Sequence, residues 1–214
     1  MIQAHKIRLN PTPEQEVYFR KAAGTARFVY NWALAQWKNV HAATPNVSYG
    51  MMAAKKDFND LKAEQFPWVY DVAKDVAEGA FTNLGAALKH YFDSKSGKRK
   101  GEKIGFLKFK SKKNTKQSFR RNNDKFTASG YRFYVPKLGW VNMAEALRFQ
   151  GKILGAVVSK VADWWFVSIQ VEVAKPEPIR FVKASVGVDL GIKILATLSD
   201  GVEFGTCIFL VQER

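Results

Sequence analysis

The hydrophobic pattern of this 214-residue chain changes its period once, near Asp93. Before that point, apolar residues recur at steps of three and four over residues 12–43, 48–63 and 68–92, which is typical of amphipathic helices. After it, short β-branched and aromatic runs are separated by Gly, Pro, Asn or Asp, which is typical of strands and turns. The change predicts an α+β fold in which three helices bury their apolar stripes against one another.

The beginning of the first helix carries the clearest local signal. Residues 1–10 alternate loosely, as a short strand does, and end in an Asn-Pro turn signal. Thr12, Pro13 and Gln15 then provide an N-cap, a proline at the first helical position and the second member of a capping box. We therefore expect a short strand, then a long helix that begins directly after Thr12 and ends near Ala43.

The second half of the chain predicts strands short enough for a small β-barrel or a strongly twisted sheet. A Pro-rich linker at 175–178 separates them from two further apolar strands at 184–188 and 192–198. The runs before the linker are 104–109, 117–121, 131–135, 140–141, 147–150, 153–161 and 164–173.

The positive charge is concentrated in one segment. The chain has a formal net charge of +15, and residues 95–125 alone hold thirteen Lys or Arg against Glu102 and Asp124, a net +11 in 31 residues. Such a stretch is typical of polyanion binding, and interleaved Phe side chains offer faces on which bases can stack. A loop kept basic for solubility is the alternative, whereas several glycines argue against a membrane-bound amphipathic helix.

A single cysteine and the absence of long apolar runs bound the cellular context. Cys207 alone cannot form an internal disulfide or a structural zinc site, which favours a reducing, cytoplasmic location. No segment approaches the 18 apolar residues or so that a membrane span needs. We therefore expect a cytoplasmic protein that is neither secreted nor inserted in a membrane.

One carboxylate stands out as a candidate catalytic group. Asp189 ends an apolar strand between Gly187 and Gly191, where it could bind a metal in the manner of ribonuclease H, lie in a phosphate loop like that of actin-like ATPases, or occupy a plain turn. A pair of Mg²⁺ ions needs several carboxylates, and the nearest acidic residues that follow it are Asp200 and Glu203.

Polar side chains of the helical half are candidates for phosphate or base contacts. They lie off the apolar stripes or near helix ends, and comprise Arg27, Asn31, Ser48, Tyr49 and Lys74. Arg132 and Lys137 are further candidates beside an aromatic strand. Most of the aromatic residues in the helical half are expected to be core.

Five motifs in a fixed order resemble the OrfB/TnpB family of transposon-encoded RNA-guided nucleases, which are relatives of the type V CRISPR effectors. The motifs occupy residues 7–15, 24–31, 105–110, 136–140 and 187–193, and the resemblance runs from about residue 1 to residue 204.

This resemblance implies an architecture. Residues 1–10 would be the first strand of an OB-like β-barrel called the wedge, 11–94 a helical recognition bundle, 95–178 the rest of the wedge, and 179–214 the start of a ribonuclease H-like RuvC domain. It also implies a transposon-derived guide RNA, target DNA and Mg²⁺, since in this family base pairing reads the sequence and the protein recognises backbone and shape.

The resemblance also assigns site residues. Asp189 matches the first RuvC carboxylate and metal ligand. Tyr49, Lys74, Asn122 and Asn123 lie where the family meets the duplex beside its target. The basic candidates in the segment and its neighbourhood complete the nucleic-acid-binding set: Arg27, Lys108, Lys110, Lys112, Lys113, Arg120, Arg121, Arg132 and Lys137.

The chain departs from the family near its end. The other RuvC carboxylates and the zinc ribbon of the family belong to a second half, and residues 205–214 no longer resemble it. We expect a truncated, nuclease-deficient protein that still binds RNA and DNA. The alternatives are half of an endonuclease completed by a second chain, and a generic RNA-binding protein. Residues 192–198 and 208–211 are expected to form an exposed, partly unpaired sheet edge that promotes self-association.

Overall fold

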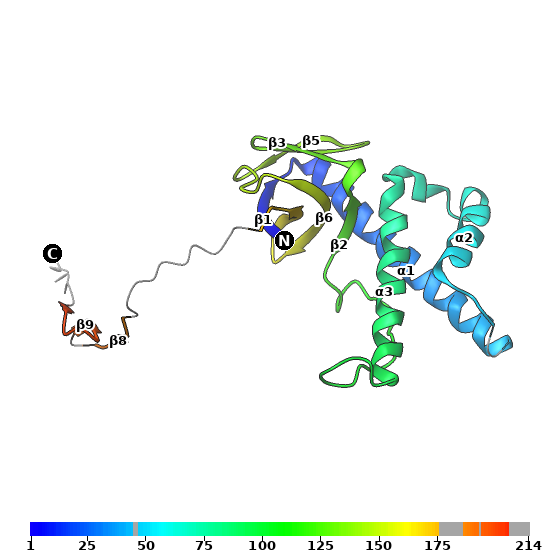
Figure 1. Ribbon diagram of the computed structural model, residues 1–214. Helices are drawn as coiled ribbons and strands as arrows, with labels where there is room; N and C mark the ends of the chain where they lie inside the picture. The colour runs from blue at the N-terminus through cyan, green and yellow to red at the C-terminus, as the bar shows by residue number, and fades with distance from the viewer. Residues whose placement is uncertain (45–46, 176–185, 193, 206–214) are drawn as a thin grey trace. The chain divides into compact units, whose positions relative to one another are not determined.

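The computed structural model describes residues 1–44, 47–175, 186–192 and 194–205, and divides the chain into two compact units at residue 175. The first unit contains three α-helices and a large antiparallel sheet, so the α+β class predicted from the sequence is correct (Figure 1). Among the described residues, no helix has both the length and the apolarity to cross a membrane.

The helices begin and end close to the predicted positions. Helix α1 spans Pro13–Ala43, and the Thr12 side chain accepts from the Gln15 amide while the Gln15 side chain bonds the Thr12 amide, which confirms the capping box. Helix α2 spans Met51–Gln65 and α3 spans Lys74–Lys95.

The third helix differs from the prediction at its start. The expected single helix from residue 68 is instead a 3-10 turn, Pro67–Asp71, followed by two extended residues before α3. The break is fixed by tertiary structure, because the Tyr18 hydroxyl accepts the Ala73 amide hydrogen at 3.0 Å and Val72 is buried.

The sheet has seven antiparallel strands in the order β2-β6-β7-β1-β5-β4-β3. Alternate residues of each long strand face a core that α1 closes on one side, where the Phe19 ring packs against those of Trp165 and Phe119. The strands curl around this core in Figure 1, while closure into a barrel stays a prediction. Their bounds are Ile2–Asn10 (β1), Ser118–Asn122 (β2), Thr127–Ser129 (β3), Arg132–Val135 (β4), Gly139–Met143 (β5), Lys152–Val161 (β6) and Trp164–Glu172 (β7).

Two predicted strands are wrong. Residues 104–109 and 147–150 have no strand structure. The first segment packs on the helices instead: Leu107 joins the bundle core, and the Phe106 ring lies 5.9 Å from that of Trp37. Its apolar residues are therefore explained by burial against the bundle.

The second unit contains a small antiparallel sheet in the order β10-β9-β8, formed by Val188–Leu190 (β8), Ile194–Leu198 (β9) and Glu203–Gly205 (β10). The expectation of an unpaired edge at 192–198 is wrong, because β9 is the central strand and pairs on both sides. Residues 208–211 lie outside the described residues. A ribonuclease H-like identity for this sheet stays a prediction.

Candidate nucleic-acid interface

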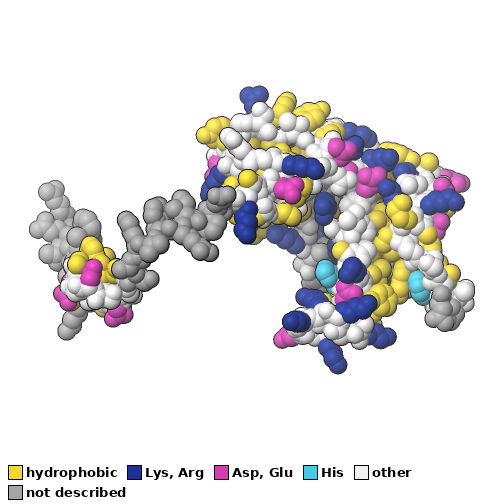
Figure 2. All heavy atoms as spheres, in the orientation of Figure 1, with side chains coloured by type: hydrophobic (Ala, Val, Ile, Leu, Met, Phe, Trp, Pro, Cys, Tyr) yellow, Lys and Arg dark blue, Asp and Glu magenta, His cyan; other side chains and the backbone are white. Residues whose placement is uncertain are grey.

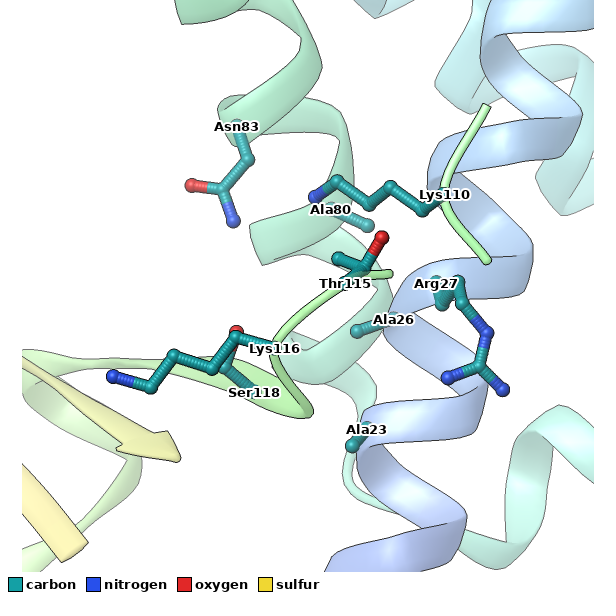
Figure 3. A pocket seen from close by; sticks show the side chains of 9 residues that line it. All are labelled: Ala23, Ala26, Arg27, Ala80, Asn83, Lys110, Thr115, Lys116 and Ser118. Atoms are coloured by element: carbon teal, nitrogen blue, oxygen red, sulfur yellow. The ribbon is translucent and has the colours of Figure 1, made fainter. Parts of the chain in front are cut away.

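A small basic hollow lies between α1, α3 and the loop that leads into β2. Three alanines form its floor, because residues without long side chains leave space between the two helices and the loop (Figure 3). Three cations and three small polar groups complete the lining, which contains no carboxylate. The lining residues are Ala23, Ala26, Arg27, Ala80, Asn83, Lys110, Thr115, Lys116 and Ser118.

The cations of this hollow approach it from different segments. In Figure 3 the Lys110 side chain extends across the hollow above Thr115, with Asn83 on the far helix, while Arg27 and Lys116 extend outward on opposite sides. None of the three cations forms an ion pair with a carboxylate in the part of the chain that the structure describes. Their charge is therefore available to an anion such as a phosphate.

Lys110 is held in place by its backbone and by an aromatic ring. The Asn31 amide group donates to the Lys110 carbonyl and accepts from the Lys110 amide, both at 2.8 Å. The Lys110 ammonium lies 3.8 Å from the centre of the Tyr30 ring. Burial lowers the pKa of Lys110. Asn31, which we expected to contact a ligand directly, instead anchors the loop that carries this lysine.

Arg121 is the one site residue that the structure contradicts. Its side chain is fully buried and its guanidinium contacts the Asp75 carboxylate at 2.5 Å and donates to the Lys125 carbonyl. Asp75 also accepts the Asn122 amide hydrogen at 3.2 Å. Desolvation, the largest influence, raises the pKa of Asp75 and lowers that of Arg121, while their mutual attraction opposes both shifts. Arg121 therefore joins β2 to α3 and is not exposed to a polyanion.

A second basic cluster lies between α2 and α3. Glu78 contacts Lys55 at 3.0 Å and Lys74 at 4.0 Å, and Asn122 lines the same hollow. Burial, followed by repulsion from Lys74, lowers the pKa of the neighbouring Lys62. Glu78 thus neighbours both predicted residues, Lys74 through the ion pair and Asn122 through the shared hollow.

Tyr49 lies at the start of α2 and is engaged within the chain. Its hydroxyl donates to the Asp57 carboxylate at 2.7 Å. Burial first, and then Asp57, raise the pKa of Tyr49. The phenol therefore stays protonated, and its ring is partly buried against the core of the helices.

The remaining predicted contacts divide by exposure. Lys137 is exposed and donates to the Tyr70 carbonyl, whereas Arg120 is half-buried where β2 approaches Gly79 of α3. The others are exposed to solvent, and Figure 2 shows Lys and Arg side chains gathered around the end of α3 and the loop that follows it. The exposed residues are Lys108, Lys112, Lys113, Asn123 and Arg132.

Asp189 lies on an exposed strand, β8, opposite Thr197 of β9. The described residues contain no group of three or more Asp, Glu, His or Cys side chains that could share a metal ion. This donor set does not fit a pair of Mg²⁺ ions, which require several carboxylate oxygens.

The sequence analysis missed several lining residues of the basic hollow: Lys116, Asn83, Thr115 and Ser118. Lys116 was recognised only as one of the positive charges of residues 95–125. A partial signal existed in the spacing of Ala23 and Ala26 on α1, since small residues on an inward helix face allow another segment to approach.

Comparison with known proteins agrees with the five motifs. A family model described as a helix-turn-helix domain (HTH_OrfB_IS605) matches residues 1–45, which here form β1 and α1. "Putative RNA-guided DNA endonuclease InsQ" of Escherichia coli K12 is 32% identical over 205 residues, or 95% of this chain and 48% of that protein. "Putative RNA-guided DNA endonuclease" of Streptomyces pristinaespiralis is 27% identical over 93% of this chain and 48% of its own length.

These matches place the chain in a class of proteins related to RNA-guided DNA endonucleases. More narrowly, it belongs to the OrfB/TnpB family. It spans about half the length of the curated relatives that it matches. The cryo-EM structure of a Cas12f1-sgRNA-target DNA complex is also similar, with a TM-score of 0.41 and 11% identity over 96% of this chain and 57% of that chain.

Proposed function

We propose that this chain binds nucleic acid, namely a transposon-derived guide RNA and its target DNA, through the helices and the curled sheet. The observation that carries the proposal is the basic hollow, where Arg27, Lys110 and Lys116 line a floor of alanines without a carboxylate among the lining residues. A protein surface seldom keeps so many like charges together unless an anion neutralises them.

The chemistry of the hollow suits a phosphate backbone better than an isolated small anion. Lys108, Lys112 and Lys113 continue the positive charge along the same loop, so contacts can follow successive phosphates. Asn83, Thr115 and Ser118 add hydrogen-bonding groups that can orient a phosphate or a sugar. The lysine cluster between α2 and α3 offers a second surface for duplex DNA.

We also propose that the chain does not cleave DNA by itself. In this proposal the curled sheet is the wedge barrel, and β8 with Asp189 corresponds to the first segment of a RuvC domain. Asp189 would be one metal ligand among the several that cleavage with Mg²⁺ requires. Incubation of the full chain with Mg²⁺, guide RNA and target DNA should give no cleavage, and cutting that disappears in Asp189→Ala would refute this.

The salt dependence of RNA binding tests the first proposal. Replacing Lys108, Lys110, Lys112 and Lys113 by Gln should flatten the slope of log K against log salt by about three, because each phosphate contact contributes about 0.7 to 0.9. Fluorescence anisotropy over a series of salt concentrations measures this slope for the wild type and the variant.

The matched control carries the same change in charge elsewhere. Lys21, Lys56, Lys89 and Lys175 are exposed and lie outside the basic segment, and their replacement by Gln should leave the slope nearly unchanged. Equal flattening by both sets would show that only net charge matters. RNA from the end of the same transposon should bind well above a control RNA of equal length, which separates this function from generic RNA binding.

A further inference from the structure

The outer face of the β1–β7 strand pair carries an alternating set of cations and aromatic rings. Strand register places Arg8 opposite Phe166 and Lys6 opposite Ser168. The Lys6 ammonium lies 4.3 Å from the centre of the Phe166 ring, and the Arg8 guanidinium lies 4.8 Å from that of Trp164. Because every second residue of a strand points to the same face, the two rings stand about 7 Å apart along β7.

This face is exposed although it is rich in aromatic surface. Trp164 is 53% exposed, whereas its neighbour Trp165 points into the core and is 2% exposed. Core packing therefore explains Trp165 but leaves the position of Trp164 unexplained. Across the strand pair, Val157 and Val161 of β6 extend the apolar surface and are also exposed.

The cations of this face have no acidic partners among the residues that the structure describes. Neither Lys6 nor Arg8 forms an ion pair with a carboxylate within the described ranges. The acidic residues of β7 and its preceding turn lie at the two ends, Asp163 beside the turn and Glu172 in register with Lys152 of β6. The centre of the face therefore combines positive charge with exposed π surface.

We propose that this face binds unpaired nucleotides, with bases stacked on Trp164 and Phe166 and phosphates contacted by Lys6 and Arg8. The proposal rests on the proposed function and adds to it a specific ligand class and place. Stacking on aromatic side chains tolerates any base because every base has a π face, and the cation beside each ring matches the charge of the backbone. Bases that are paired in a duplex cannot reach the rings, so single strands are the ligand.

Oligonucleotides with and without bases test this proposal on the full chain. A labelled oligouridine of about 12 nucleotides should bind more tightly than an abasic strand of the same length and charge. The Trp164→Ala/Phe166→Leu variant should lose about ten-fold in affinity for oligouridine, keep its affinity for the abasic strand, and keep its salt slope. Leu at 166 retains an apolar contact with β1, and circular dichroism confirms folding.

Matched variants separate stacking from general surface effects. Tyr131→Ala removes another ring, 64% exposed, from the turn before β4, and should leave the preference for bases intact. Lys6→Gln/Arg8→Gln should weaken binding of both strands and flatten the salt slope. Oligothymidine in place of oligouridine shows whether the face distinguishes RNA from DNA single strands, and either strand bound in preference to its abasic counterpart supports the proposal.

The outcomes distinguish this inference from the proposed function. A preference for bases that persists in Trp164→Ala/Phe166→Leu overturns the assignment of this face. Salt-dependent binding with no preference for bases in the wild type overturns it too, but leaves the proposed function standing. If the wild type binds neither strand, both proposals fail.

Discussion

Two cations of the same basic segment, Arg121 and Lys110, are both withdrawn from water, yet they have opposite surroundings. Arg121 is fully buried against the Asp75 carboxylate and a backbone carbonyl. Lys110 is half-buried over the Tyr30 ring and has no carboxylate partner in the described part of the chain. The first charge is neutralised within the fold and joins two elements, whereas the second leaves positive potential at the surface. A charge count along the sequence treats them alike, and only their partners separate structure from binding.

Removing the carboxylate of the buried pair should have the largest effect. Asp75→Ala leaves Arg121 buried without a counter-charge, and such a loss lowers the free energy of unfolding by about 3–5 kcal/mol. Urea unfolding followed by circular dichroism measures the change. Asp93→Ala is the matched control, because its pair with Lys89 at 2.6 Å is on the exposed side of α3. Equal shifts of the two urea midpoints would contradict a structural role for the buried pair.

The next largest effect on stability is expected where β2 packs closely against α3, at Gly79. A Cβ added at Gly79 would lie 2.9 Å from the Arg120 Cβ and 3.6 Å from its carbonyl oxygen. Gly79→Ala should therefore destabilise by about 1–3 kcal/mol through overpacking, although alanine has the better helix propensity.

Gly85→Ala in the same helix is the control. Its nearest neighbour would be the flexible Met51 side chain at 3.1 Å, so its gain in helix propensity, about 1 kcal/mol, should be offset only in part. Thermal unfolding compares the melting temperatures of the two variants. Similar stabilisation by both would show that β2 does not pack tightly at Gly79.

The position of Lys110 is tested by changing Asn31, which holds the Lys110 backbone. Asn31→Ala removes two hydrogen bonds to the Lys110 backbone, worth about 1–2 kcal/mol together. Global stability should fall little, but amide exchange in residues 104–110 should accelerate and RNA affinity should drop. Hydrogen exchange with mass spectrometry measures the amide exchange of residues 104–110, and Asn142→Ala on β5 is the control variant. Unchanged exchange would mean that the loop is held by its apolar contacts alone.

Local pattern was sufficient for the helices and for most of the strands. The capping box at Thr12 predicted the start of α1 correctly because both of its bonds are made within four residues. The break before α3 was not predictable, since it depends on the Tyr18 hydroxyl, 55 residues away from Ala73. The false strand at 104–109 has the same origin: its apolar residues serve contacts with helices that local propensity cannot reveal.

The candidate site was predictable only in composition. Arg27 and Lys110 were among the predicted contacts, and the structure brings them into one hollow. Lys116 was not selected, because membership of the hollow depends on how the loop crosses α1 and α3. Arg121 was wrongly included, because its burial depends on Asp75, 46 residues earlier. Charge along the sequence identifies a candidate segment for nucleic-acid binding, while tertiary contacts decide which of its charges remain available.

A smaller effect on stability is expected from replacing Glu16. This residue connects α1 to the sheet, as Asp75 connects α3 to β2. Its carboxylate contacts Arg20 at 2.8 Å, accepts from the Trp165 indole at 3.2 Å and lies 3.5 Å from Lys160. The hydrogen bond from Arg20, followed by that from Trp165, lowers the pKa of Glu16 below its usual 4.5. Because the folded state binds the proton less readily than the unfolded state, this stabilisation is present above that value and is lost as the pH falls through the lowered pKa.

Glu16→Gln removes this acid-sensitive contribution. The difference in melting temperature between the wild type and Glu16→Gln should therefore be larger near pH 6 than near pH 3. Glu64→Gln is the control, because Glu64 is exposed and forms no ion pair among the residues that the structure describes. A constant difference across this pH range would show that Glu16 holds α1 to the sheet through packing or neutral hydrogen bonds, and would confine the structural role of charge to the buried pair at Arg121.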